Sequence, residues 1–141
     1  MATRFLDLAA LEARTGHPVR SEYRSPDEPV GLPPADAVVV APATYNTINK
    51  WAAGISDTFA LGLLAEARGL GLPAVVLPFV NKALAANPAF EGSVTRLRAT
   101  GVIVLHGREG HEPHEPGTGD RQLPGYPWEL ALDAVETRGS L

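Results

Sequence analysis

Residues 38–57 read VVVAPATYNTINKWAAGISD, and the interpretation of the whole chain starts from this stretch. The apolar run 37–41 is typical of a parallel strand that is buried on both faces. Where the next helix is predicted to begin, the run is followed by Thr44, Tyr45, Asn46 and Thr47. Because the first N–H groups of a helix have no partner inside the helix, this turn suits an anionic or strongly hydrogen-bonding ligand.

The alternation of strand and helix continues along the chain. Buried strands are predicted at 73–77 and 102–105. Helices are predicted at 47–68, with Gly54 as a weak point, and at 87–99, ended by Gly101. Repetition of this kind indicates a parallel sheet with right-handed crossovers. We therefore predict a fold of the α/β class with helices on both faces of the sheet.

The outer parts of the chain are less regular in sequence. An amphipathic helix is predicted at 3–16, a short strand at 18–23 and a proline-rich loop at 25–34. Residues 106–127 are rich in Gly, Pro and His and are predicted to form a lid-like loop, followed by a closing helix at 128–137. We interpret residues 1–141 as one domain with an ordered core at about 1–105.

Composition limits the classes of function. The 141 residues carry a net charge of −4, and no cluster of Lys or Arg indicates a nucleic-acid or membrane partner. No apolar segment is long enough to cross a bilayer, and the N-terminus lacks the pattern of a signal peptide. The chain has no cysteine, which excludes disulfides and a cysteine nucleophile and fits a cytoplasmic protein.

Polar side chains also follow the second predicted strand. In open parallel sheets, ligands bind outside the carboxyl ends of the strands, where the turn 44–47 and the segment 78–88 should meet. Asn81 could bind a carboxylate through its amide, or it could cap a short helix. The turn 44–47 has the same two interpretations, a ligand site or a helix cap, and local chemistry leaves both open.

Three of the four histidines lie in the loop after the third predicted strand: His106, His111 and His114. Pro113 prevents a regular helix from presenting the last two together, and no ligand set with metal spacing is evident, so we predict no metal. A mobile lid with a proton-transfer group and a merely solvated loop are the remaining interpretations.

The motif 42–47, PATYNT, followed by GISD, resembles the flavin-dependent decarboxylase family that includes phosphopantothenoylcysteine decarboxylase and the lantibiotic cysteine decarboxylases. A second family motif corresponds to PFVNKALA at 78–85, and the likeness covers about residues 1–105. It implies a Rossmann-like, three-layer domain that binds FMN and assembles as homo-oligomers, in trimers or their multiples. It also implies that Thr44, Tyr45, Asn46, Thr47 and Phe79 contact the flavin.

The same resemblance implies that Asn46 also reaches the substrate and that Asn81 holds the carboxylate of a small substrate. The family's catalytic histidine has no counterpart here, because Glu28 stands at the corresponding place, and the lid has no cysteine to donate a proton. Decarboxylation is therefore expected only if other groups move protons. The catalytic residues stay unknown, with Glu28, His111 and His114 as candidates.

The family begins with a strand, a phosphate loop, a helix and a second strand, a unit of about 30 residues. This chain starts after that unit, so we expect an N-terminally truncated domain with an exposed strand edge and weak FMN binding. A partner chain could supply the unit. A non-catalytic or regulatory flavin-binding subunit and a flavin prenyltransferase-like enzyme are the alternative functions.

Overall fold

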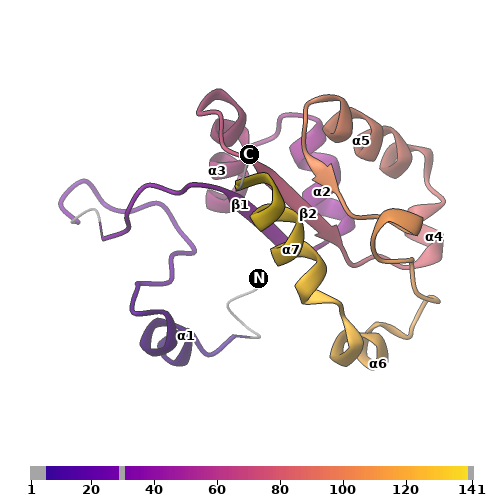
Figure 1. Cartoon of the computed structure of the whole chain (residues 1–141), viewed down its shortest axis with the longest axis horizontal. Coiled ribbons are helices and arrows are strands. Elements are labelled where there is room, and N and C mark those ends of the chain that lie inside the picture. Colours follow the sequence, from indigo (N-terminus) through magenta and orange to yellow (C-terminus); the bar gives the residue numbers. More distant parts are fainter. Residues whose placement is uncertain (1–5, 29–30, 140–141) are drawn as a thin grey trace.

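The computed structural model describes residues 6–28 and 31–139, and its centre is a parallel sheet of three strands (Figure 1). The strands are β1 (Val38–Ala43), β2 (Ala74–Pro78) and β3 (Ile103–Val104), in the order β1-β2-β3. The α-helices are α1 (Leu8–Thr15), α2 (Tyr45–Ala52), α3 (Phe59–Gly69), α4 (Lys82–Ala85), α5 (Pro88–Ala99), α6 (Gly119–Gln122) and α7 (Trp128–Gly139). Two short 3-10 helices, η2 (Gly107–Glu109) and η3 (Leu123–Gly125), complete the described elements.

The middle strand is buried along its whole length, as its continuous apolar sequence predicts. β2 pairs with β1 in the register Val38↔Ala74 and with β3 in the register Val75↔Ile103. The predicted α/β class and parallel sheet are confirmed. β3 is shorter than predicted, with two residues in place of the four at 102–105.

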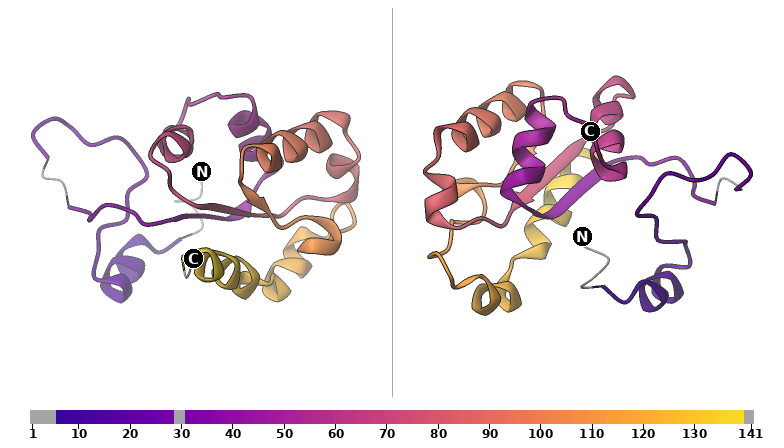
Figure 2. Two further views of the ribbon diagram at one scale, coloured as in Figure 1. Left: turned by 45° about the horizontal axis from the view of Figure 1, so that its top comes forward. Right: turned by 180° about the vertical axis from the view of Figure 1, so that it is seen from behind.

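Helices cover both faces of this sheet (Figure 2). One face carries α2, α3 and α5, and the core there is built around Ile48, Phe90 and Val104. The other face carries α7, where Val75 and Leu77 pack against Tyr126 and the helix. The result is the predicted three-layer arrangement, and the closing helix is confirmed.

The single helix predicted at 47–68 is wrong. α2 ends at Ala52, and α3 begins only at Phe59. Gly54 has φ +75°, a left-handed conformation that ends a helix and that glycine adopts without strain. Thr58 then caps α3 by accepting a hydrogen bond from the Leu61 N–H at 3.2 Å.

The segment before β1 contains α1 and little other regular structure. The helix ends at Gly16 (φ 71°), as predicted, but contributes no buried residue to the core. The strand predicted at 18–23 is wrong, since these residues form no ladder in the structure. The segment extends away from the sheet to one side, near the end at which β1 begins (Figures 1 and 2). No helix within residues 6–28 and 31–139 has the length and apolar character needed to cross a membrane.

Candidate functional site at the carboxyl edge of the sheet

The turns that follow β1 and β2 lie side by side. The Phe79 N–H donates a hydrogen bond to the Ala43 carbonyl at 2.8 Å, and Ala43 is in register with Pro78. The polar residues 44–47 and 79–81 therefore share one edge of the sheet. This is the edge where ligands bind in open parallel sheets.

The first turn is organised by a helix cap. Thr44 Oγ1 accepts a hydrogen bond from the Thr47 N–H at 3.2 Å and lies 3.0 Å from Thr47 Oγ1. Thr44 and Asn46 are exposed, whereas Thr47 is half-buried. The capping interpretation is thus realised, and it leaves the exposed side of the turn open to a ligand.

Tyr45 differs from its three neighbours. Its ring stacks on Phe90, with centroids 5.9 Å apart and planes 17° apart, and packs against the core below the sheet's edge. The ring therefore has a structural role, and Tyr45 keeps part of its surface exposed at the turn.

Asn81 also acts as a cap. Its Oδ1 accepts a hydrogen bond from the Leu84 N–H at 2.9 Å and starts the short helix α4. This arrangement uses the amide oxygen, and the amide nitrogen donates no hydrogen bond to any described residue. An amide nitrogen of this kind can donate to a carboxylate.

The histidine segment folds onto the second turn instead of extending as a separate loop. His114 N–H donates to the Val80 carbonyl at 3.2 Å, and Lys82 N–H donates to the His114 carbonyl at 2.8 Å. An ion pair between Lys82 and Glu115 joins the same two segments. The prediction of a loop over all of 106–127 is partly wrong, since η2, α6 and η3 lie within it.

An aromatic cluster results, formed by Phe79, His111, His114 and Tyr126. The centroid of the Phe79 ring lies 4.6 Å from that of His114 and 6.1 Å from that of His111, both stacked. Tyr126 meets Phe79 edge-on at 5.5 Å. Two of the predicted catalytic candidates, the histidines, are thus brought against the residue predicted to lie beside the flavin.

The histidines of this cluster hold unpaired nitrogen atoms. His111 Nε2 and His114 Nδ1 are buried and have no hydrogen-bond partner among the described residues. Burial lowers the pKa of His111 below its ordinary value, and the neighbouring His114 lowers it further. Both effects favour the neutral form of the His111 ring.

Tyr126 is a site residue that the sequence analysis missed. Its hydroxyl donates a hydrogen bond to the Leu77 carbonyl, and burial raises the pKa of the phenol. Leu77 lies in β2, whose pairing with β1 is interrupted between Val40 and Ala43. Pro42 lies within this interruption and, as a proline, has no N–H to donate to the neighbouring strand. A lone tyrosine inside the Gly- and Pro-rich run 116–127 was the available signal, because such an aromatic residue usually anchors a loop.

Glu28 is not brought to the site. It is exposed in the segment that precedes β1, and its Oε2 accepts a hydrogen bond from the Ser25 N–H at 3.1 Å. His106 is close to His111 in the sequence, but its ring packs against Phe90, with the two ring centroids 5.1 Å apart. Within residues 6–28 and 31–139, no three His, Asp or Glu side chains gather as a metal site requires.

Comparisons with known proteins place this chain in a family. The sequence pattern of the family described as Flavoprotein matches residues 17–123. The chain is 32% identical over 112 residues to a coenzyme A biosynthesis bifunctional protein CoaBC of Thermococcus kodakarensis, covering 76% of this chain and 28% of that protein. It is 33% identical over 123 residues to CoaBC of Mycobacterium bovis, covering 84% of this chain and 26% of that protein. The chain therefore spans little more than a quarter of the length of these relatives.

Solved structures show the same fold. The FMN-dependent cysteine decarboxylase SpaF aligns with a TM-score of 0.62 and 28% identity, covering 92% of this chain and 75% of that one. The cypemycin decarboxylase CypD aligns with a TM-score of 0.60 and 24% identity, covering 74% of this chain and 60% of that one. The similarity to CypD supports the fold alone, whereas the family match and SpaF agree with the predicted resemblance.

Proposed function

Because this chain belongs to the Flavoprotein family, we propose that it binds FMN at the carboxyl edge of the sheet and acts there as a decarboxylase-like flavoenzyme on a small carboxylated substrate. One observation carries the proposal. The two turns that correspond to the family's motifs are joined by the Phe79–Ala43 hydrogen bond, and the aromatic cluster lies against them.

The residues present fit the cofactor. Exposed Thr44 and Asn46 and the free N–H groups at the start of α2 offer donors to an anion or to ring carbonyls. The Phe79 ring offers an apolar surface to a flat ring system, in the way that aromatic rings commonly stack. When bound, FMN supplies a ring that accepts and returns electrons.

The chain's own contribution is positioning and proton transfer. In this proposal Asn81 Nδ2 donates to the carboxylate of the substrate while Oδ1 continues to cap α4. His111 and His114 take the proton-transfer role for which the family's histidine and cysteine are absent. Both rings stack on Phe79, and each holds a buried nitrogen atom without a partner among the described residues. Exposed Glu28 lies outside this arrangement and is not part of the proposal.

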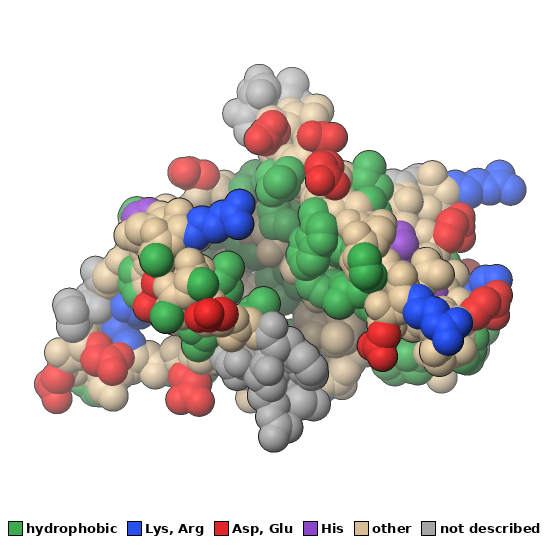
Figure 3. Space-filling view, turned by 90° about the horizontal axis from the view of Figure 1, so that it is seen from below, with side chains coloured by type: hydrophobic (Ala, Val, Ile, Leu, Met, Phe, Trp, Pro, Cys, Tyr) green, Lys and Arg blue, Asp and Glu red, His purple; other side chains and the backbone are tan. Residues whose placement is uncertain are grey.

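Assembly into homo-oligomers, or with a partner chain, extends this proposal. Hydrophobic side chains gather at the centre of the face that is seen from below (Figure 3). In α7, Trp128 is 45%, Leu130 39% and Leu132 54% exposed. On the edge strand β1, Val39 is 38% exposed. Such surfaces fit subunit contacts. A cytoplasmic location stays a prediction.

The experiment that tests the proposal is titration of FMN with the purified chain, followed by quenching of flavin fluorescence. The informative variant is Asn46→Asp, which adds a negative charge in the first turn of α2. A carboxylate there favours the helix, so the fold should be retained, but it removes the amide donor and repels the carbonyl oxygens of the flavin ring. The matched control is Asn87→Asp at the cap of α5, where Asp caps as well as Asn.

We expect weak but saturable binding of FMN, an affinity about tenfold lower in Asn46→Asp, and no change in Asn87→Asp. Asn81→Asp keeps the cap and should spare the flavin while it weakens binding of a carboxylated substrate. Equal FMN affinity in the wild type and in Asn46→Asp would contradict the proposal that FMN binds at this edge of the sheet.

A further inference from the structure

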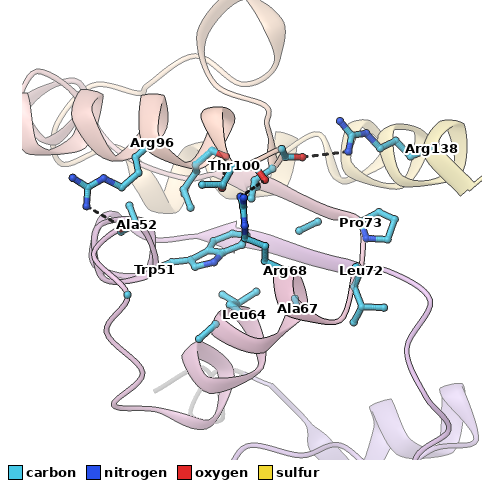
Figure 4. A pocket seen from close by; sticks show the side chains of 17 residues that line it. Trp51, Ala52, Leu64, Ala67, Arg68, Leu72, Pro73, Arg96, Thr100 and Arg138 are labelled. Carbon is cyan, nitrogen blue, oxygen red and sulfur yellow. Dashed lines mark hydrogen bonds between the residues drawn. The ribbon is translucent and has the colours of Figure 1, made fainter.

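A second cavity lies at the opposite edge of the sheet, where β2 and β3 begin (Figure 4). It has a volume of about 440 Å³ and is bounded by Pro73, Ala74 and Val102. The last turns of α2, α3, α5 and α7 form its rim. The flavin edge and its aromatic cluster contribute none of the residues that line it.

Three arginines from three different helices line this cavity. Arg68 crosses it from α3 and donates to the Thr100 carbonyl at 2.8 Å. Arg138 of α7 donates to the Gly101 carbonyl at 3.2 Å, and Arg96 of α5 donates to the Ala52 carbonyl at 3.4 Å. Each guanidinium carries five N–H donors, so a single anchoring bond orients the group and leaves donors for a ligand.

No carboxylate neutralises these arginines within the described part of the chain. The residues that line the cavity include no Asp or Glu. The ion pairs that the structure describes, Lys50–Asp57 and Lys82–Glu115, lie elsewhere. The three exposed arginines therefore line the cavity without an acidic residue among its lining, with Arg68 at the centre and Arg96 and Arg138 at the two ends (Figure 4).

Helix dipoles provide the competing explanation. Arginines near helix C-termini stabilise the carbonyl ends, and each end carries roughly half a negative charge. Four helix ends around the cavity amount to about two negative charges, against three guanidiniums. The remaining positive charge is what an anion would neutralise.

Apart from Thr100, the rest of the lining is apolar, and it includes the indole of Trp51 and the side chains of Leu64 and Leu97. Trp51 and Leu64 lie beside Arg68 in Figure 4. A volume of 440 Å³ lies in the range of small-molecule pockets, which is about 300–1,000 Å³. An apolar wall beside fixed cationic donors matches a ligand with an apolar or aromatic body and one anionic group.

We propose that the cavity between the sheet's amino edge and the ends of α2, α3, α5 and α7 is a second binding site, which takes a small organic anion through Arg68, with Arg96 and Arg138 adding positive charge at its two ends. The anionic group is a phosphate or a carboxylate, and both use the same arginine chemistry. The site is independent of the proposed flavin function.

Isothermal titration calorimetry of the full chain tests this site with two aromatic probes, 4-nitrophenyl phosphate and benzoate. The variants are Arg68→Gln and Arg138→Gln, which keep a side-chain donor but lose the charge. The matched control is Arg14→Gln, an exposed arginine of α1 outside the cavity. Thermal melting of each variant establishes that it is folded, and a repeat with Asn46→Asp tests whether the probes bind at the flavin edge instead.

We expect one probe to bind at a 1:1 ratio, with an affinity about tenfold lower in Arg68→Gln and in Arg138→Gln. Binding should be unchanged in Arg14→Gln and in Asn46→Asp, which alters only the flavin edge. Tighter binding of either probe supports the site and identifies its anionic group. Absence of binding by both probes, equal affinity in folded Arg68→Gln, or weaker binding in Asn46→Asp would overturn the proposal.

Discussion

The hydroxyl of Tyr126 offers the sharpest test of how the histidine segment is held against the sheet. The residue is 3% exposed, and its hydroxyl donates to the carbonyl of Leu77, which is completely buried. Tyr126→Phe removes the hydroxyl alone and keeps the ring contacts with Phe79, His111 and Trp128. The substitution therefore isolates one hydrogen bond.

The expected cost follows from the burial of both partners. A neutral hydrogen bond contributes about 1 kcal/mol to the free energy of unfolding, and a buried carbonyl left without a donor adds to the loss. We expect Tyr126→Phe to lower the free energy of unfolding by about 1–2 kcal/mol. For a chain of this size, this corresponds to a fall in melting temperature of roughly 3–8 °C.

Urea unfolding followed by circular dichroism measures this difference. The matched control is Tyr23→Phe, because Tyr23 is 66% exposed and its ring contacts Phe59. Exposed substitutions of this kind change stability by less than about 0.5 kcal/mol. If the two variants were equally stable, the hydrogen bond to Leu77 would not hold the segment, and our account of the aromatic cluster would fail.

Two further predictions concern the core and the histidines. Phe90→Ala should lower the free energy of unfolding by about 3–5 kcal/mol in the same urea experiment, because the ring is fully buried and packs on Tyr45 and His106; a loss below 1 kcal/mol would contradict this packing. The melting temperature should fall as the pH is lowered from 7 to 5. Burial holds the pKa of His106 and His111 below that of the unfolded chain, so the unfolded chain takes up protons first and gains stability as the pH falls. His111→Gln should show a smaller fall, and an identical pH profile would remove His111 from this explanation.

Much of the fold could be predicted because its signals are local. The run 74–78 is apolar without interruption, and only a strand covered on both faces tolerates such a sequence. Gly16 and Gly54 lie where helices end, and both adopt positive φ. The break between α2 and α3 does not follow from Gly54 alone, because an isolated glycine can also lie inside a helix, and it is Thr58, a good capping residue, that starts α3.

The candidate site was predictable only in part. Thr44 and Asn81 could be identified because each follows an apolar run and begins a helix, and the structure shows both acting as caps. The inward direction of Tyr45 was not predictable, since the same turn could expose or bury its ring. The direction of the Tyr45 ring is decided by the core, where the ring stacks on Phe90.

The sequence by itself determined the strands, most helix ends and the family resemblance, because these depend on the chemistry of neighbouring residues. Tertiary structure alone decided which distant groups meet. His111, His114 and Tyr126 reach Phe79 only because the segment after β3 folds back to bond with Val80 and Lys82. The three arginines of the opposite cavity come from three helices that converge only once the sheet has formed. Such contacts depend on long-range packing, and no spacing along the chain encodes them.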